Sequence, residues 1–297
     1  MIKGIFPPVT TPFINDEISY TKLVENLEKW NETELAGYVV LGSNGESVYL
    51  TREEKIQLIE TVRKNTPKSK KLIAGTGLDS IKETISLTNE AADSGADFAL
   101  ILTPSFFKSG MKHDAFLRYF VEIAEKSSIP IIIYNVPKFT GVNIEADTVA
   151  KLAEHPNIIG MKNSSENVAH LAEVIHKTPK KFSNIVGTAS VLFPGLCVGA
   201  KAGILALANC APNECVKILK LYNDNKITEA AHLQKKLIDL NKAVTAKYGV
   251  AGLKAVMDLA GYFGGLPRSP LSGLKDEQIE DLKNILVNAD IETTIES

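Results

Sequence analysis

A lysine placed directly after an apolar run is the residue with the clearest chemical potential in this sequence. Lys162 follows the run Ile158–Met161, which we expect to be buried. Burial disfavours the charged form of a lysine, and a neutral amine is the nucleophile that attacks a ketone to form an imine. The alternative is a lysine whose stem is buried while its ammonium reaches water. The residue alone leaves both interpretations open.

A tyrosine and a hydroxyl-bearing turn follow two other apolar runs. Tyr134 ends one of them, where a phenol can pass protons to and from a bound substrate. The other leads into the turn Gly42–Glu46, with the sequence GSNGE. Backbone N–H groups of such a turn, with the side chains of Ser43 and Asn44, can bind a carboxylate. Each feature also has a structural explanation: a tyrosine bonded to a backbone carbonyl, or an ordinary glycine-rich turn.

These residues belong to a regular alternation of short apolar runs and longer amphipathic stretches. Each run is apolar throughout, which is typical of parallel strands buried on both faces. The stretches between them have helical periodicity, and the capping box that starts at Thr51 opens one of them. Eight strand–helix units predict an α/β fold, a closed (β/α)8 TIM barrel. The eight runs are Ile5–Val9, Tyr38–Leu41, Leu72–Ala74, Phe98–Leu102, Ile131–Tyr134, Ile158–Met161, Ile185–Val186 and Ile204–Leu207.

The barrel gives the three chemical features a common place. Active sites of parallel barrels lie where the strands end, at the C-terminal face. Lys162, Tyr134 and Ser43 follow three different strands, so we expect them to converge near the barrel axis. A single site explains their positions more simply than three separate structural roles.

The alternation stops after Ala211. Residues 213–223, 227–247, 250–262 and 275–288 have the periodicity of helices, with no strand between them. One helix completes the barrel, so the others form an extension. We therefore expect a barrel core over residues 1–211 and C-terminal helices over residues 212–297.

Composition and charge argue against several classes of function. The formal net charge of −2 gives no basis for binding nucleic acid or an anionic membrane. We find no apolar stretch long enough to span a bilayer and no signal peptide, so we expect a cytoplasmic protein. The histidines form neither an HxH nor an HExxH group, and the three cysteines are not spaced as metal ligands. We therefore expect no metal site.

Three motifs together resemble a known family. The GSNGE turn, the sequence YNVP at residues 134–137 and the strand that ends in Lys162 are similar to those of the dihydrodipicolinate synthase / N-acetylneuraminate lyase family of pyruvate-dependent class I aldolases. The resemblance covers nearly the whole chain. It implies a TIM barrel with C-terminal helices, a homotetramer, a 2-oxo acid substrate, and catalysis through a covalent lysine imine without a cofactor.

The resemblance also implies roles for individual residues. Lys162 matches the lysine that forms the Schiff base with pyruvate, and Tyr134 matches the general acid/base. Ser43 and Asn44 match positions that hold the pyruvate carboxylate and relay protons. Two further matches, Gly187 and Ile204, line the pyruvate pocket. Ser164 is our candidate for contacting the hydroxyl-bearing part of the substrate.

Departures from the family pattern bear on the second substrate. The synthases carry an arginine two residues after the YNVP proline, which binds the carboxylate of aspartate semialdehyde, and this chain has Phe139 there. Phe106 replaces a tyrosine of the proton relay, and phenylalanine can neither bind a carboxylate nor relay a proton. The segment 155–165, HPNIIGMKNSS, resembles the 4-hydroxy-2-oxoglutarate aldolase branch, although Asn163 stands where an aspartate is common.

Three functional hypotheses follow. The first is a lyase, an aldolase that cleaves a 4-hydroxy-2-oxo or 2-oxo-3-deoxy acid to pyruvate and an aldehyde. The second is another reaction on the same imine: 4-hydroxy-tetrahydrodipicolinate synthase, N-acetylneuraminate lyase or sugar-acid dehydratase. The third is a barrel that binds a 2-oxo acid without turnover. The sequence does not identify the aldehyde.

Overall fold

The chain folds into a barrel of eight parallel strands, as the sequence predicts. A computed structural model describes residues 1–293. The strands lie side by side in the order β1-β10-β9-β8-β7-β6-β5-β4. The ends of the sheet meet through a parallel bridge between Pro8 and Val39, where Val9 N donates to Val39 O at 2.9 Å. The strands are β1 (Gly4–Phe6), β4 (Gly37–Val40), β5 (Lys71–Gly75), β6 (Phe98–Leu102), β7 (Ile131–Asn135), β8 (Ile158–Asn163), β9 (Ser183–Val186) and β10 (Ala202–Ile204).

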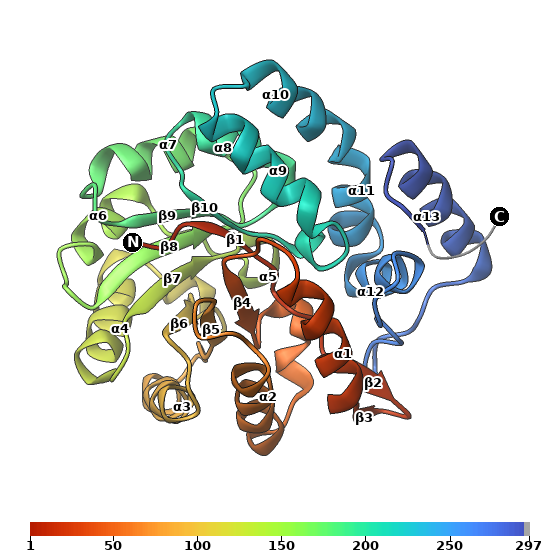
Figure 1. The fold of residues 1–297 in the computed structure, drawn as a ribbon. Coiled ribbons are helices and arrows are strands. Elements are labelled where there is room, and N and C mark those ends of the chain that lie inside the picture. Colours follow the sequence, from red (N-terminus) through yellow and green to blue (C-terminus); the bar gives the residue numbers. More distant parts are fainter. Residues whose placement is uncertain (294–297) are drawn as a thin grey trace.

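Helices surround this barrel, and the strands lie inside them, near the centre of Figure 1. Along the chain, barrel strands and helices alternate. Two helix starts follow clear sequence signals: Thr51 is the N-cap of a capping box before α2, and Ser80 caps α3. A small antiparallel hairpin, β2 (Phe13–Ile14) with β3 (Glu17–Ile18), is an addition that we did not predict. The helices over residues 20–223 are α1 (Tyr20–Asn31), α2 (Arg52–Lys64), α3 (Ile81–Asp93), α4 (His113–Lys126), α5 (Pro137–Thr140), α6 (Ala146–Leu152), α7 (Val168–Lys177), α8 (Leu192–Cys197) and α9 (Pro212–Asn223).

The remaining helices gather on one side of the barrel, toward the C-terminal end of the chain (Figure 1). The predicted helix 227–247 is divided into α10 (Ile227–Lys236), α11 (Ile238–Lys242) and a π-helical turn, Ala243–Lys247. The backbone stays in the right-handed helical region between them, so the change is in hydrogen bonding rather than in chain direction. Two longer helices follow, α12 (Gly249–Leu259) and α13 (Asp276–Asn288).

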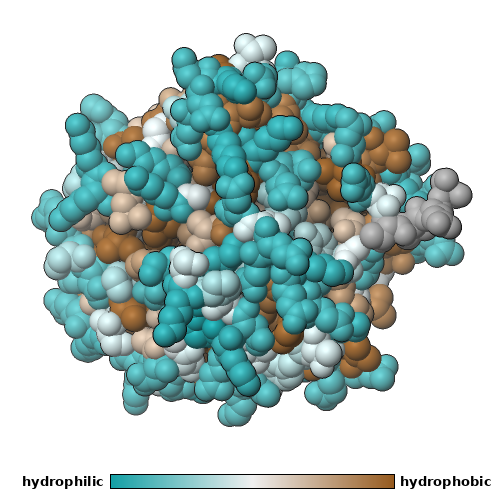
Figure 2. Space-filling model, viewed as in Figure 1, coloured by the Kyte–Doolittle hydropathy of each residue, from teal (hydrophilic) through white to brown (hydrophobic). Residues whose placement is uncertain are grey.

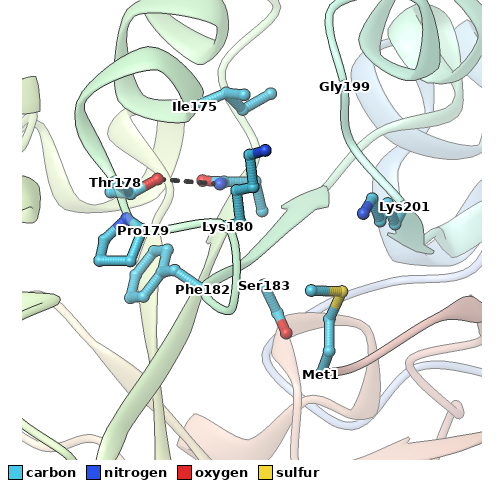
Figure 3. A pocket seen from close by; sticks show the side chains of 10 residues that line it. Met1, Ile175, Thr178, Pro179, Lys180, Phe182, Ser183, Gly199 and Lys201 are labelled. Carbon is cyan, nitrogen blue, oxygen red and sulfur yellow. Dashed lines mark hydrogen bonds between the residues drawn. The ribbon is translucent and has the colours of Figure 1, made fainter.

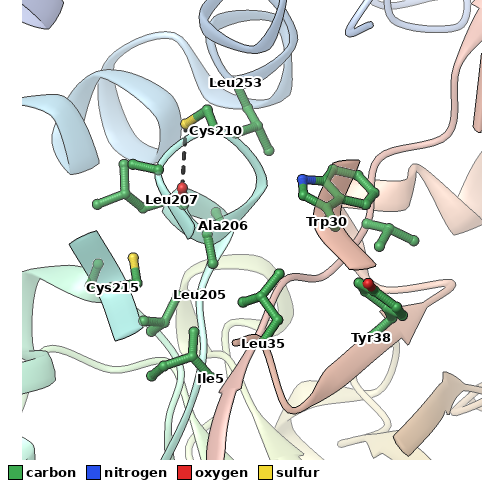
Figure 4. Close-up of a cluster of buried hydrophobic side chains, with 14 of the residues drawn as sticks. Ile5, Trp30, Leu35, Tyr38, Leu205, Ala206, Leu207, Cys210, Cys215 and Leu253 are labelled. Atoms are coloured by element: carbon green, nitrogen blue, oxygen red, sulfur yellow. Dashed lines mark hydrogen bonds between the residues drawn. The ribbon is translucent and has the colours of Figure 1, made fainter. Parts of the chain in front are cut away.

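The C-terminal helices share a hydrophobic core with the barrel. Figure 4 shows Leu253 of α12 in the same buried cluster as Trp30 of α1 and Leu205, which follows β10. The ring of Trp30 also stacks on Tyr262 beyond α12, with centroids 5.7 Å apart. The helices after the barrel are therefore packed on it rather than tethered to it.

The last barrel strand lies earlier in the chain than predicted, at Ala202–Ile204. The run Ile204–Leu207 forms a strand only to Ile204, and a 3-10 helix, Ala206–Asn209, takes its end. Asn209 explains this change, because its side-chain amide donates to Ala206 O at 2.9 Å and to Pro8 O at 3.1 Å. These bonds hold the 3-10 turn against the segment that follows β1.

The strands are buried on both faces, as parallel strands of a barrel should be. In β7, Ile131 and Ile133 pack under the surrounding helices, while Ile132 and Tyr134 belong to the cluster inside the barrel. On the side seen in Figure 2, hydrophilic side chains predominate and hydrophobic ones appear in separate groups. Within residues 1–293, no helix combines the length and apolar character needed to cross a bilayer.

Candidate active site

The predicted lysine and tyrosine lie next to each other on neighbouring strands. Tyr134 and Lys162 are register partners across β7 and β8, so both side chains point into the barrel at the same height. Only 3% of Lys162 and 7% of Tyr134 are exposed. The Lys162 Nζ lies over the Tyr134 ring, 4.1 Å from the ring centroid. The amine is therefore shielded from water rather than extended into it.

The phenol of Tyr134 has an unusual electrostatic setting. Burial raises the pKa of Tyr134, but the charge of Lys162 and hydrogen bonds with Ser43, Ser164 and Lys162 outweigh burial and lower it below its ordinary value. A phenol with a lowered pKa releases its proton more readily, which suits a group that must both accept and return a proton.

The hydroxyl-bearing turn reaches the same place from β4. Residues Ser43–Gly45 form one turn of 3-10 helix, and Ser43 Oγ lies 3.5 Å from the Tyr134 hydroxyl. This distance exceeds an ordinary bond between two hydroxyls, although catalytic contacts often tighten only when substrate binds. Asn44, the next residue, is half-buried.

Backbone conformation shapes this turn. Leu41 and Glu46 flank residues 42–45 and have positive φ values of 61° and 55°, which bulky residues rarely adopt. Thr11 Oγ1 donates to Gly45 O at 2.7 Å, which fixes the turn to the segment after β1. Such strained residues persist where their surroundings define them strongly, commonly at functional sites.

The other predicted residues border the same end of the barrel. Ser164 Oγ donates to Gly187 O at 3.3 Å, and Gly187 N donates to Asn163 O at 2.8 Å. A Cβ at Gly187 would lie 2.1 Å from Ser164 Oγ, so this close approach requires glycine. Ile204 is fully buried and belongs to the interior cluster that contains Tyr134. Every predicted site residue therefore lies at this end of the barrel or in the interior cluster beneath it.

A hydrogen-bonded network of buried amide side chains, at the ends of β7 and β8, was not predicted. Asn135 and Asn163, which directly follow Tyr134 and Lys162, are bonded to each other at 3.2 Å. Asn163 also contacts His170 Nδ1 at 3.1 Å, and His170 Nε2 contacts Ile144 O at 3.1 Å. With that geometry, the Asn163 amide donates to Nδ1 and Nε2 donates to the Ile144 carbonyl. The only sequence signal was Asn163 in the place of an aspartate.

A cavity of about 370 Å³ lies at the opposite end of the barrel (Figure 3). It is lined by residues at the beginnings of β9 and β10, among them Ser183 and Lys201, and by Lys180 and Thr178. No predicted site residue lines it. Since parallel barrels place their chemistry at the strand ends, the cluster around Lys162 is the better candidate.

Comparison with known proteins assigns the chain to a family. The model of the dihydrodipicolinate synthetase family matches residues 1–289. The chain is 34% identical to the 4-hydroxy-tetrahydrodipicolinate synthase of Methanothrix thermoacetophila, over 96% of each chain. The chain belongs to the dihydrodipicolinate synthetase family. As a member, it is an enzyme of the lyase type, a class I aldolase.

Solved structures of the family agree in fold. The dihydrodipicolinate synthase of Acinetobacter baumannii, solved in complex with pyruvate, has a TM-score of 0.92 and 30% identity, covering 98% of this chain and 100% of that chain. YagE of Escherichia coli K12, a family member also solved with pyruvate, has a TM-score of 0.93 and 27% identity, with the same coverage.

The comparisons do not support the narrower assignment made from the sequence. The segment 155–165 predicts the 4-hydroxy-2-oxoglutarate aldolase branch, but the similar curated proteins are named 4-hydroxy-tetrahydrodipicolinate synthase. Family membership is thus shown, while the aldolase branch is not.

Proposed function

We propose that Lys162 forms a Schiff base with pyruvate, or with the pyruvyl part of a larger 2-oxo acid, and that the enzyme makes or breaks the adjacent carbon–carbon bond. The observation that supports this proposal is the buried amine of Lys162 over the ring of Tyr134. Two structurally similar family members were solved with pyruvate, which supports the same substrate.

The chemistry needs only groups of this chain and the substrates. The Tyr134 phenolate takes a proton from the Lys162 ammonium, the resulting amine adds to the ketone carbon, and loss of water gives the imine. Tyr134 donates a proton to the departing hydroxyl and later takes one up. Ser43 and Asn44 hold the carboxylate, so that the ketone faces the amine.

The protonated imine then acts as an electron sink. In synthesis, Tyr134 takes a proton from C3 of the bound pyruvate, and the resulting enamine attacks the carbonyl carbon of an aldehyde, whose oxygen receives that proton. In cleavage, Tyr134 takes the proton of the C4 hydroxyl, the electrons of the C3–C4 bond move to the imine, the aldehyde leaves, and C3 of the enamine takes up the proton. Hydrolysis of the imine returns the free amine, with no net oxidation or reduction.

For the second substrate, the first candidate is aspartate semialdehyde. The curated relatives that match over nearly their full length are 4-hydroxy-tetrahydrodipicolinate synthases. This assignment has more support from the comparisons than cleavage of 4-hydroxy-2-oxoglutarate.

One observation favours the second candidate, an aldolase for a 4-hydroxy-2-oxo acid. Phe139 stands where the synthases carry their carboxylate-binding arginine, and its side chain is 63% exposed. Lys138 does not replace that arginine, because its Nζ donates to Thr245 O at 2.9 Å. An aldehyde that needs no such arginine fits this site better.

A substrate panel with Lys162→Ala as the blank tests the proposal. We expect wild type either to condense pyruvate with aspartate semialdehyde or to release pyruvate from 4-hydroxy-2-oxoglutarate, with both activities abolished in Lys162→Ala. N-acetylneuraminate and sugar acids complete the panel. An imine trapped without turnover of any substrate would indicate a binding protein and contradict the enzymatic proposal. The homotetramer that the family resemblance implies is tested by light scattering after size-exclusion chromatography.

A further inference from the structure

A buried ion pair joins the C-terminal helices to the hydroxyl-bearing turn. Glu46, the last residue of the GSNGE sequence, contacts Lys254 of α12, with Oε1 2.6 Å from Nζ. The two side chains are 2% and 0% exposed. No proposed catalytic or binding step uses either residue.

The pair has further partners on both sides. The second carboxylate oxygen of Glu46 accepts from Arg268 N at 2.8 Å. The Lys254 Nζ donates to Leu266 O at 2.9 Å and lies 4.5 Å from the centroid of the Phe13 ring. The Arg268 guanidinium lies 4.9 Å from the same ring centroid. Phe13 thus lies between two cationic groups, the Lys254 ammonium paired with Glu46 and the Arg268 guanidinium paired with Glu54.

Arg268 is itself fixed to the barrel. Its guanidinium bonds to both carboxylate oxygens of Glu54, at 2.8 Å and 2.7 Å, in the first turn of α2. It also donates to Tyr49 O at 3.1 Å. The segment after α12 therefore holds the GSNGE turn at Glu46 and the following helix at Glu54.

Stability alone does not explain a pair buried this deeply. Removing two charges from water costs several kcal/mol per ion, and apolar residues of similar size often serve stability as well or better. Burial lowers the pKa of Lys254, and Glu46 opposes part of that change. A carboxylate does provide what an apolar side chain lacks: it fixes one backbone position through several directed contacts.

That backbone position is the strained end of the turn. Glu46 has a φ of 55°, and Ser43 lies three residues before it, at the start of the 3-10 helix. Glu46 N donates to Ser43 O at 3.2 Å, so the two residues move together. Holding Glu46 therefore sets where Ser43 stands relative to Tyr134.

We propose that Glu46 and Lys254 are positioning residues, which hold the Ser43–Asn44 turn in the place where it receives the carboxylate of the 2-oxo acid. This inference rests on the proposed function, because it takes Ser43 and Asn44 as the carboxylate site. It gives the C-terminal helices a part in the active site, although neither residue touches substrate.

The test measures how much pyruvate is needed to form the adduct. Each protein is mixed with a series of pyruvate concentrations, reduced with borohydride, and the modified fraction is read by mass spectrometry. For Lys254→Met, which leaves Glu46 buried and unpaired, we expect at least a tenfold rise in the half-saturating concentration. The adduct should still form at saturating pyruvate, because Lys162 and Tyr134 are unchanged.

A matched control separates positioning from stability. Val256 is fully buried on the same helix and has no contact with Glu46 among the hydrogen bonds and ion pairs of residues 1–293. Val256→Ala should lower the melting temperature and leave the half-saturating concentration unchanged. A shift no larger in Lys254→Met than in Val256→Ala would overturn the inference.

Two further variants cover the case in which Lys254→Met does not fold. Glu46→Gln keeps the shape of the side chain and its bond from Arg268 N but removes the charge. The double variant Glu46→Gln/Lys254→Met leaves no buried charge unpaired, so it should fold. Its half-saturating concentration should be raised above that of wild type and should differ little from that of Glu46→Gln alone, since the residues act as a pair; a wild-type value in the double variant would contradict the inference. No adduct in wild type would instead overturn the proposed function, and the inference with it.

Discussion

Tyr134 and Lys162 are register partners on adjacent strands, and the lysine amine lies 4.1 Å from the centroid of the tyrosine ring. One strand pairing therefore fixes the distance between the proposed nucleophile and the proposed general acid/base. Regular strands hold catalytic groups more firmly than loops do. The turn that carries Ser43 has to be held by other means.

Removing only the Tyr134 hydroxyl should slow catalysis without unfolding the protein. In Tyr134→Phe the ring remains over Lys162, and the hydroxyl that is removed lies at the long distance of 3.5 Å from Ser43 Oγ. We expect kcat to fall by about 10²-fold or more, with little change in melting temperature. Tyr119→Phe is the matched control, because this buried phenol bonds to Leu78 O outside the site. Equal effects of the two substitutions on kcat would contradict the role of Tyr134.

The acidity of Tyr134 should depend on Lys162. The pKa of Tyr134 is lowered although burial alone raises it, because the Lys162 charge and hydrogen bonds favour the phenolate. Lys162→Met removes that charge and keeps the burial, so the pKa should rise and the phenolate should form only at higher pH. The pKa of Tyr134 is measured from phenolate absorbance during a pH titration. The absorbance of Tyr134→Phe is subtracted from that of wild type, and the absorbance of Lys162→Met/Tyr134→Phe from that of Lys162→Met. An unchanged or lower pKa in Lys162→Met would contradict the electrostatic coupling.

Gly187 should not tolerate a side chain. The new Cβ of Gly187→Ala would lie 2.1 Å from Ser164 Oγ and 2.8 Å from Asn163 O, so the end of β8 must shift. We expect the free energy of unfolding to fall by about 1–3 kcal/mol and the KM for the 2-oxo acid to rise. Gly110→Ala is the control, since a Cβ there meets nothing within 4 Å. Urea denaturation and steady-state kinetics give both quantities, and a wild-type result for Gly187→Ala would show that Ser164 and Gly187 can separate freely.

A substitution at Phe139 should distinguish between the two candidate reactions, condensation with aspartate semialdehyde and cleavage of a 4-hydroxy-2-oxo acid. Phe139→Arg introduces the cation that, by the family resemblance, binds the carboxylate of aspartate semialdehyde at this position in the synthases. If the wild-type enzyme acts on an aldehyde without that requirement, the variant should condense pyruvate with aspartate semialdehyde at least tenfold faster than wild type. Phe139→Ala, which removes the ring without adding charge, controls for space. Efficient condensation by wild type, with no gain in the variant, would instead favour the synthase.

Local signals made the fold, and the meeting of Lys162 and Tyr134 at one end of the barrel, predictable. Strands buried on both faces leave apolar runs, and caps such as Thr51 and Ser80 mark helix starts, so the order of barrel strands and the starts of these helices follow from short stretches of sequence. Lys162 and Tyr134 could be brought together because parallel barrels place the ends of their strands at one face. Their mutual register depends on an irregularity that the sequence does not show: Ile131 pairs with Ile158 but Ile132 pairs with Gly160, so that Tyr134 comes to face Lys162 and not Met161.

Pairings between distant segments could not be predicted in this way. Glu46 in a glycine-rich turn has the sequence appearance of a solvated residue, and only tertiary packing places it beside Lys254. The contact of Asn163 with His170 depends likewise on how α7 packs after β8. The identity of the aldehyde is harder still to predict, because Phe139 indicates only that the arginine of the synthases is missing and does not indicate which aldehyde binds instead.

The most direct test of the central claim is the location of the trapped adduct. Wild-type protein is incubated with pyruvate, reduced with borohydride, digested, and sequenced by tandem mass spectrometry, with Lys162→Ala treated in parallel. We predict one reduced pyruvyl adduct, on the peptide that contains Lys162, and none in the variant. An adduct on another lysine, or no adduct in wild type, would contradict the claim that this buried amine is the nucleophile.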